Sequence, residues 1–161
     1  MAGTVTWAVI TAADLAPFLV APQLTALRTV ALAQGQNDPF DDLLPICAGR
    51  VRDYIVSNPR NLLSATPNSV PPGTCVWCLC WLMIEALQAR VPTLKLTEDQ
   101  KKEISNAKNE LEKIRRAVAN NQLLIPQPDD PELDPAQSFG PQAYTVSSSP
   151  RLATRETLSG L

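Results

Sequence analysis

The segment from Thr74 to Arg90, TCVWCLCWLMIEALQAR, carries apolar residues on nearly every side of the helix that it predicts. Only Glu85 and Arg90 are charged. A helix that is apolar all round is surrounded by protein. A chain of 161 residues with 45% hydrophobic residues has room for one core. We expect that core to cover one side of this helix and a second subunit to cover the remainder.

The most regular pattern lies between Thr97 and Asn120. The sequence TEDQ places Thr97 and Gln100 in a capping box, which marks the start of a helix. The apolar residues that follow recur in steps of three and four, with lysine, arginine and glutamate between them. These seam residues are Ile104, Ala107, Leu111, Ile114 and Val118. The pattern predicts a long amphipathic helix.

The N-terminal part of the chain predicts an extended segment and two short helices. Residues 1–10 are β-prone and uncapped. Thr11 and Asp14 stand close to a capping box, so a short helix is expected from there. Pro22 suits the first turn of a second helix, and Gly35 is expected to end it.

A third amphipathic helix is expected from about Pro39 to Ser57, where Asn58-Pro59 stops it. The link that follows, NPRNLLSATPNSVPPGT, holds four prolines and is expected to pack as an extended loop. After Asn121 the chain is rich in proline and acids, which predicts a spacer rather than a packed segment. We therefore expect a mainly α protein: an extended segment over 1–10, a bundle of about five helices over 11–120, and a Pro-rich spacer with a long C-terminal arm over 121–161.

Composition excludes several classes of function. The formal net charge of −2 provides no global basic field for nucleic acid or anionic membranes. The chain has no histidine, the usual partner of a nucleophilic serine or cysteine, and no Gly-rich phosphate loop. No signal peptide or membrane-spanning run is visible, so we expect folding in a reducing cytoplasm with free thiols.

Three of the four cysteines lie in GTCVWCLCW, where Cys75 and Cys78 form a C-x-x-C. On a helix, Cys80 is rotated away from both, so zinc binding would need Cys47 and a distorted helix. The position of Cys75 close to a helix start favours a lowered thiol pKa, as in a redox site. We expect core packing, and the alternative is a small cytoplasmic zinc or dithiol-redox module that uses Cys75 and Cys78.

Five stretches together resemble a known family: ITAADL, RVRDYI, VPPG before the apolar helix, NELEKIRRAVANNQLLIP, and the terminal SPRLATRETLSGL. The chain resembles the small head-to-tail adaptor (connector) proteins of Mu-like and related tailed bacteriophages. The resemblance covers most of the chain, and SPRLATRETLSGL carries most of it. Two stretches depart from the family's pattern, Ser57-Asn58-Pro59-Arg60 and GTCVWCLCW. Neither departure removes a catalytic group, because the family has none.

The resemblance implies a structural virion protein with no enzymatic activity and no cofactor. Its copies would form a homo-oligomeric ring, a dodecamer by family resemblance, between the portal protein and a tail terminator or tail-side connector protein. The ring would extend the channel through which packaged DNA passes without sequence-specific binding, and it would not contact a membrane. Its place would be the head-to-tail junction of the virion, reached from the host cytoplasm during assembly.

Candidate contact residues follow from these expectations. Trp77 and Trp81 are expected in the core or at a subunit interface rather than stacked on bases. The residues expected at a subunit or portal interface are Trp77, Trp81, Phe139, Tyr144, Arg151, Leu152, Arg155 and Leu158. The charged face of the last helix is expected to be solvated, and its channel-facing candidates are Lys101, Lys102, Arg115 and Arg116.

Overall fold

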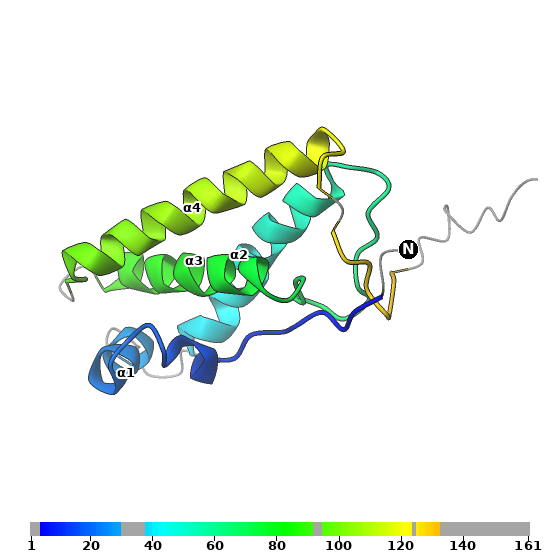
Figure 1. The fold of residues 1–161 in the computed structure, drawn as a ribbon. Helices are drawn as coiled ribbons and strands as arrows, with labels where there is room; N and C mark the ends of the chain where they lie inside the picture. Colours follow the sequence, from blue (N-terminus) through cyan, green and yellow to red (C-terminus); the bar gives the residue numbers. More distant parts are fainter. Residues whose placement is uncertain (1–3, 30–37, 92–94, 124, 133–161) are drawn as a thin grey trace, which may run out of the picture.

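The computed structural model describes residues 4–29, 38–91, 95–123 and 125–132. These residues form one 3₁₀ helix, η1 (Ala12–Leu15), and four α-helices: α1 (Ala21–Thr29), α2 (Pro39–Val56), α3 (Thr74–Arg90) and α4 (Glu98–Ala119). Among them, β-pairing is limited to three isolated bridges. The prediction of a mainly α fold is confirmed (Figure 1).

Helix α3 is the centre of the molecule. It packs against α2 on one side and α4 on another, and α1 and η1 cover part of what remains. Nine of its residues are buried by the chain itself: Cys75, Cys78, Leu79, Cys80, Trp81, Leu82, Met83, Ile84 and Leu87. The expectation that the chain's own core covers only one side of this helix is therefore wrong, because the short helices and the irregular segments supply more cover than their sequences suggest.

Helix α4 begins and packs as its sequence predicts. The Gln100 amide N–H donates to Thr97 Oγ1 at 3.2 Å, and the Thr97 amide N–H donates to Gln100 Oε1 at 3.0 Å. This reciprocal capping box satisfies two donors that would otherwise lack a helical partner. The whole predicted seam is buried: Ile104, Ala107, Leu111, Ile114 and Val118.

The first N-terminal helix is shorter than its pattern suggests. The amide and hydroxyl of Thr11 both donate to the Asp14 carboxylate, at 2.6 and 2.8 Å, but only the single turn η1 follows. Pro17 comes two residues after η1, and its missing N–H cannot continue a helical ladder. The second helix, α1, holds Pro22 in its first turn, and its predicted end at Gly35 lies outside the described residues.

Helix α2 starts at a cap that also ties it to α1. The Asp38 carboxylate accepts from the Phe40 amide at 2.9 Å and forms an ion pair with Arg28 at the end of α1. At its other end α2 stops before Asn58-Pro59, as predicted. The link from 58 to 73 then runs without regular structure to α3, as expected for a segment with four prolines.

The folded body extends beyond the predicted helical domain of residues 11–120. Trp7 and Ile10 of the N-terminal segment are buried in the main core, at 4% and 2% exposure. Ile125, beyond the last helix, is also buried in that core. Residues 4–10 and 125–132 therefore belong to the same folded unit as the helices.

Candidate interaction site at the base of the C-terminal arm

Three irregular segments come together beside the helices. They are the N-terminal segment 4–10, the link 58–73 and residues 125–132, which we call the strap. The strap runs beside the N-terminal segment at Val5 and beside the link at Ser64, and the N-terminal segment pairs with the link at Ala8. Figure 1 shows the link and the strap at the end of the molecule remote from α1, where the N-terminal segment begins before it runs back toward η1. We call this three-part surface the ribbon.

Main-chain hydrogen bonds hold the strap on both of its edges. The Val5 amide donates to Gln127 O at 2.9 Å, and the Asp129 amide donates back to Val5 O at 3.1 Å. On the other edge, the Glu132 amide donates to Leu63 O at 2.6 Å. The Pro-rich segment is predicted to be a spacer rather than a packed segment, and its residues 125–132 are instead docked on the body.

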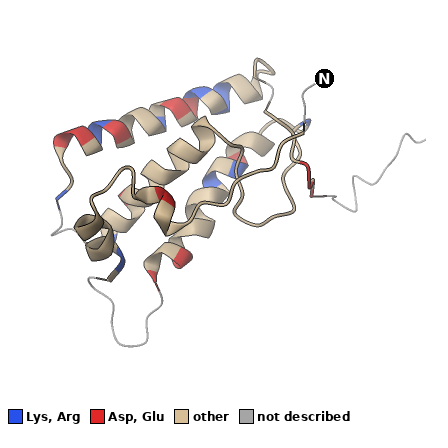
Figure 2. Ribbon diagram, turned by 60° about the horizontal axis from the view of Figure 1, so that its bottom comes forward, with Lys and Arg blue, Asp and Glu red and all other residues tan. Residues whose placement is uncertain are grey.

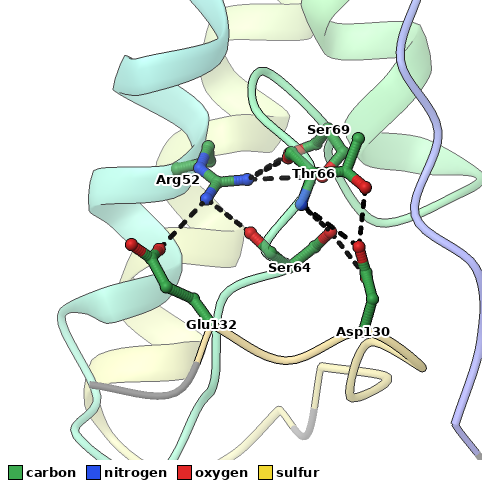
Figure 3. A network of polar contacts seen from close by, with 6 residues as sticks. All are labelled: Arg52, Ser64, Thr66, Ser69, Asp130 and Glu132. Carbon is green, nitrogen blue, oxygen red and sulfur yellow. Dashed lines mark hydrogen bonds and ion pairs between the residues drawn. The ribbon is translucent and has the colours of Figure 1, made fainter. Parts of the chain in front are cut away.

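The side chain of Arg52 binds the link at several points (Figure 3). It projects from α2, and only 14% of it is exposed. Its Nη2 donates to Ser64 O at 2.9 Å, and its Nη1 donates to Ser69 O at 3.0 Å and more weakly to Thr66 O at 3.3 Å. One guanidinium thus satisfies carbonyl groups in a loop that has no regular partner for them.

Arg52 also reaches the strap, at the last described residue. Its Nη2 lies 3.6 Å from the Glu132 carboxylate, which is 62% exposed. An ion pair this long and this exposed contributes little stability by itself. Its importance is positional, because it joins α2 directly to the point from which residues 133–161 continue.

The Asp130 carboxylate closes the network from the strap side (Figure 3). It accepts from Thr66 Oγ1 at 2.6 Å, Ser64 Oγ at 2.7 Å and the Thr66 amide at 3.1 Å. Hydrogen bonds from Thr66, then from Ser64, hold the pKa of Asp130 below its usual value. We call Arg52, Asp130, Glu132 and the link residues that they bind the clasp.

Amide side chains secure the strap from the core side. Gln127 Oε1 accepts from the Leu62 amide at 3.0 Å, and Gln127 Nε2 donates to Asn61 Oδ1 at 3.3 Å. Asn58 Nδ2 donates to Val118 O at 3.0 Å and to Asn121 Oδ1 at 2.7 Å. Because Asn58 and Asn61 are both buried, these bonds leave the amides satisfied and fix the end of α4 to the end of α2.

Sequence reasoning missed the clasp. Arg52 falls on the polar side of the predicted amphipathic helix, where the pattern alone indicates a side chain in solvent. The available signal was composition: the link and strap both place serine, threonine, asparagine and aspartate among prolines, which makes hydrogen-bonding turns. That signal does not say which segments pair.

The arm residues singled out from the sequence lie outside the described residues. They are Phe139, Tyr144, Arg151, Leu152, Arg155 and Leu158. The two tryptophans of α3 are described. Trp81 is 5% exposed, with its ring centroid 5.2 Å from that of Phe18, in the core of its own chain rather than on a surface open to another subunit or the portal. Trp77 is half-buried against the same core.

The basic residues proposed to face a channel are mostly paired with acids of the same helix. Lys101 Nζ lies 2.6 Å from Glu98, and Arg115 and Arg116 both bond Glu112, at 2.6 and 3.0 Å. Hydrogen bonds from Arg115, then from Arg116, lower the pKa of Glu112 to about 2. Figure 2 shows acidic and basic residues alternating along α4. Lys102 is exposed on the same helix.

All four cysteines are buried free thiols, as the packing interpretation predicts. Burial raises the pKa of Cys75 to about 11, and burial together with the nearby Cys75 and Glu110 raises that of Cys78 to about 12. The Cys78 S–H donates to Ala107 O, 3.5 Å away on α4. A dithiol redox centre needs an accessible thiol of low pKa, and Cys75 and Cys78 have the opposite properties.

Within the described part of the chain, no three Cys, Asp or Glu side chains gather closely enough to hold a metal ion. The same part contains no helix with the length and apolar character needed to cross a membrane. Comparison of the chain with protein-family models, curated proteins and solved structures finds no match.

Proposed function

We propose that the protein is a structural subunit of a tailed-phage virion, a head-to-tail connector whose copies form a ring between the portal and the tail. The proposal starts from the sequence resemblance, above all SPRLATRETLSGL at residues 149–161. A helical body with an anchored C-terminal extension is consistent with it. In this role the chain contacts copies of itself, the portal protein and a tail-side protein.

The observation that carries the proposal is the docked strap. A flexible arm binds more tightly when the residues from which it extends are held on the folded body, because it then loses less conformational entropy when it orders on a partner. The clasp fixes the chain at residues 130–132, directly before the segment that carries the family-like signature. An arm rooted there can add main-chain hydrogen bonds to a neighbouring subunit or to the portal.

The charge pattern of α4 supports a DNA channel without tight DNA binding. Arg115 and Arg116 share the Glu112 carboxylate within the helix, which neutralises part of the positive charge that could bind phosphates. A conduit through which DNA slides gains nothing from strong contacts. In the proposed role α4 therefore needs no DNA-binding residue of its own.

The test is the composition and structure of virions from the source phage. We expect the chain at the head-to-tail vertex in a cryo-EM reconstruction, in a ring in contact with the portal. The full-length chain, purified and analysed for metals, should carry no stoichiometric zinc. A chain absent from the virion would overturn the proposal, and stoichiometric zinc that is lost in a Cys75→Ser/Cys78→Ser variant would support the alternative zinc module.

A truncation tests the role of the arm. Deletion of residues 139–161 leaves the clasp and all of the described core intact, so the thermal midpoint and helical circular dichroism of the monomer should stay nearly unchanged. Incorporation into heads should be lost, measured by quantitative mass spectrometry of purified particles. Normal occupancy of the truncated chain, with tails attached, would refute the arm as the binding element.

A further inference from the structure

We propose that copies of this chain meet head to tail, with an apolar ridge at the start of α1 of one copy seated in a groove between α2 and α3 of the next. The inference rests on the proposed ring, for which it supplies the contact between subunits. It comes from two apolar surfaces that are exposed among the residues that the structure describes.

The ridge consists of five exposed residues around the start of α1: Ala16, Pro17, Val20, Ala21 and Pro22. Val20 is 63% exposed. No charged residue occurs between Asp14 and Arg28, which is unusual for a surface segment of a small monomer. A contiguous apolar surface of this kind marks an interaction site more often than a solvated face.

The ridge is held rigidly from behind. Its intervening residues Phe18 and Leu19 turn inward, where Phe18 packs on Trp81 and Leu19 is 4% exposed. Gln100 on α4 donates through Nε2 to Phe18 O at 3.3 Å. Two prolines restrict the backbone further. A rigid ridge loses little conformational entropy on binding, so more of the free energy gained by burying its apolar area contributes to affinity.

The groove lies between α2 and α3 and encloses about 290 Å³. Its apolar lining includes Ile46, which at 66% exposure is the most exposed of the large hydrophobic residues that the structure describes. Leu82, Ala86 and Ala89 supply the side from α3. Arg50 and Glu85 also line it. Because Glu85 already pairs with Lys108 at 2.5 Å, a charge-free occupant leaves that ion pair undisturbed.

The two surfaces lie on different flanks of α3. Trp81 faces the segment that carries the ridge, whereas Leu82 and Ala86 are roughly 100° and 140° further round the helix and line the groove. One copy can therefore offer its ridge and receive a neighbour's ridge at the same time. Two distinct complementary surfaces generate a heterologous contact, which closes into a ring when the rotation between copies allows it.

The test uses full-length chains with one surface blocked at a time. Val20→Glu blocks the ridge and Ile46→Glu blocks the groove, and both positions are exposed enough for the variants to fold, which circular dichroism checks. By sedimentation velocity, each variant alone should remain monomeric at concentrations where the wild-type chain assembles. Their equimolar mixture should form dimers and nothing larger, because only one intact ridge and one intact groove remain to meet.

A disulfide cross-link tests the same contact and can trap it even where its affinity is too low for stable assembly in solution. A Val20→Cys/Ile46→Cys chain, oxidised under native conditions, should give a ladder of interchain disulfides, since the native thiols are buried and unreactive. A Val9→Cys/Ile46→Cys chain is the matched control, because Val9 is 43% exposed but lies outside the ridge. It should give at least tenfold less interchain disulfide-linked product.

The outcomes separate this contact from the proposed function. Assembly of both glutamate variants at the wild-type level, or equal ladders from the two cysteine pairs, overturns the contact even if rings are present at the vertex. A mixture of variants that stays monomeric while the wild-type chain assembles also overturns it, because that result indicates an isologous interface. Absence of the chain from virions overturns the proposed function instead, whatever the variants do.

Discussion

The α3–α4 pair and the ribbon are held together by different kinds of contact. Along α3 and α4, stability comes from apolar residues at helical spacing that meet across one interface, and the start of α4 is capped by two residues three positions apart. In the ribbon, the defining bonds join residues far apart in the sequence: Ser64 to Asp130 across 66 positions, and Thr6 to Asp129 across 123. Burial of apolar side chains stabilises the first region, and hydrogen bonds between specific polar groups stabilise the second.

The difference predicts unequal sensitivity to substitution. A buried apolar residue of the helical pair contributes to the whole cooperative unit, so its loss affects every element. A clasp residue holds one irregular segment against the body, and its loss should open that segment locally while the helices remain. The predictions below test this asymmetry from the helical core outward.

The largest effect is expected for Leu111→Asp on α4. Leu111 is 3% exposed in the buried seam, and an unpaired carboxylate there costs several kcal/mol, comparable with the whole stability of a small domain. The variant should lose its helical circular dichroism at 25 °C. Lys113→Glu, at a side chain that is 73% exposed, is the control and should change the thermal midpoint little. A soluble, fully helical Leu111→Asp variant would contradict the assigned seam.

The sequence sufficed for the long helices because their signals are local. Thr97 and Gln100 mark the start of α4 three residues apart, and the seam to Val118 repeats within each turn. Asn58-Pro59 ends α2 by the steric restriction that proline places on its neighbour. Such features are read correctly without knowing what packs against them.

The ribbon could not be predicted because the residues that pair within it lie far apart in the sequence. Nothing local to Arg52 shows that its guanidinium binds carbonyl groups at Ser64 and Ser69, and nothing local to Asp130 shows that it bonds Thr66. The same reason explains the error on α3. Its cover comes partly from η1 and α1, whose sequences are too short to show which face they bury.

An intermediate effect is expected for Arg52→Met, which keeps an apolar stem and removes the donors. Hydrogen bonds from a charged group contribute about 1.5–3 kcal/mol, and the carbonyl groups of Ser64 and Ser69 would lose theirs. The Ala65 and Glu132 amides, which bond across the link and strap, should lose protection from hydrogen exchange before the amides of α3.

Arg50→Met on the exposed side of α2 is the matched control. It removes the same charge from the same helix without touching the link, so it should leave both amides protected. Equal protection of Ala65 and Glu132 in the wild-type and Arg52→Met chains would show that the clasp does not hold the strap.

The smallest effect is expected from titration of Asp130. Because its folded-state pKa lies below the ordinary value of 3.8, the ionised form is favoured in the folded chain. Its contribution is therefore complete above about pH 4 and is lost as the pH falls through the lower folded-state pKa. The effect on overall stability should be slight, since the carboxylate is near solvent and its interactions are screened.

A local probe is needed, because acid also protonates other carboxylates. Asp38, for example, has a lowered pKa, since hydrogen bonds from Arg28 and Phe40 outweigh the effect of its burial. The indole N–H of Trp7 donates to Pro126 O at 3.1 Å, so its NMR chemical shift responds directly to the position of the strap. In the wild-type chain this shift should stay constant from pH 7 to about 4 and move below that range.

In Asp130→Asn the Trp7 shift should already be displaced at neutral pH, because an amide cannot accept three hydrogen bonds as a carboxylate does, and it should vary less with acid. Thermal midpoints of the two chains should differ little at pH 7, since the helical core does not depend on the strap. A Trp7 shift that follows acid equally in both chains would place the pH response elsewhere. A large loss of helix in Asp130→Asn would instead show that ribbon and core unfold as one unit, against the asymmetry inferred here.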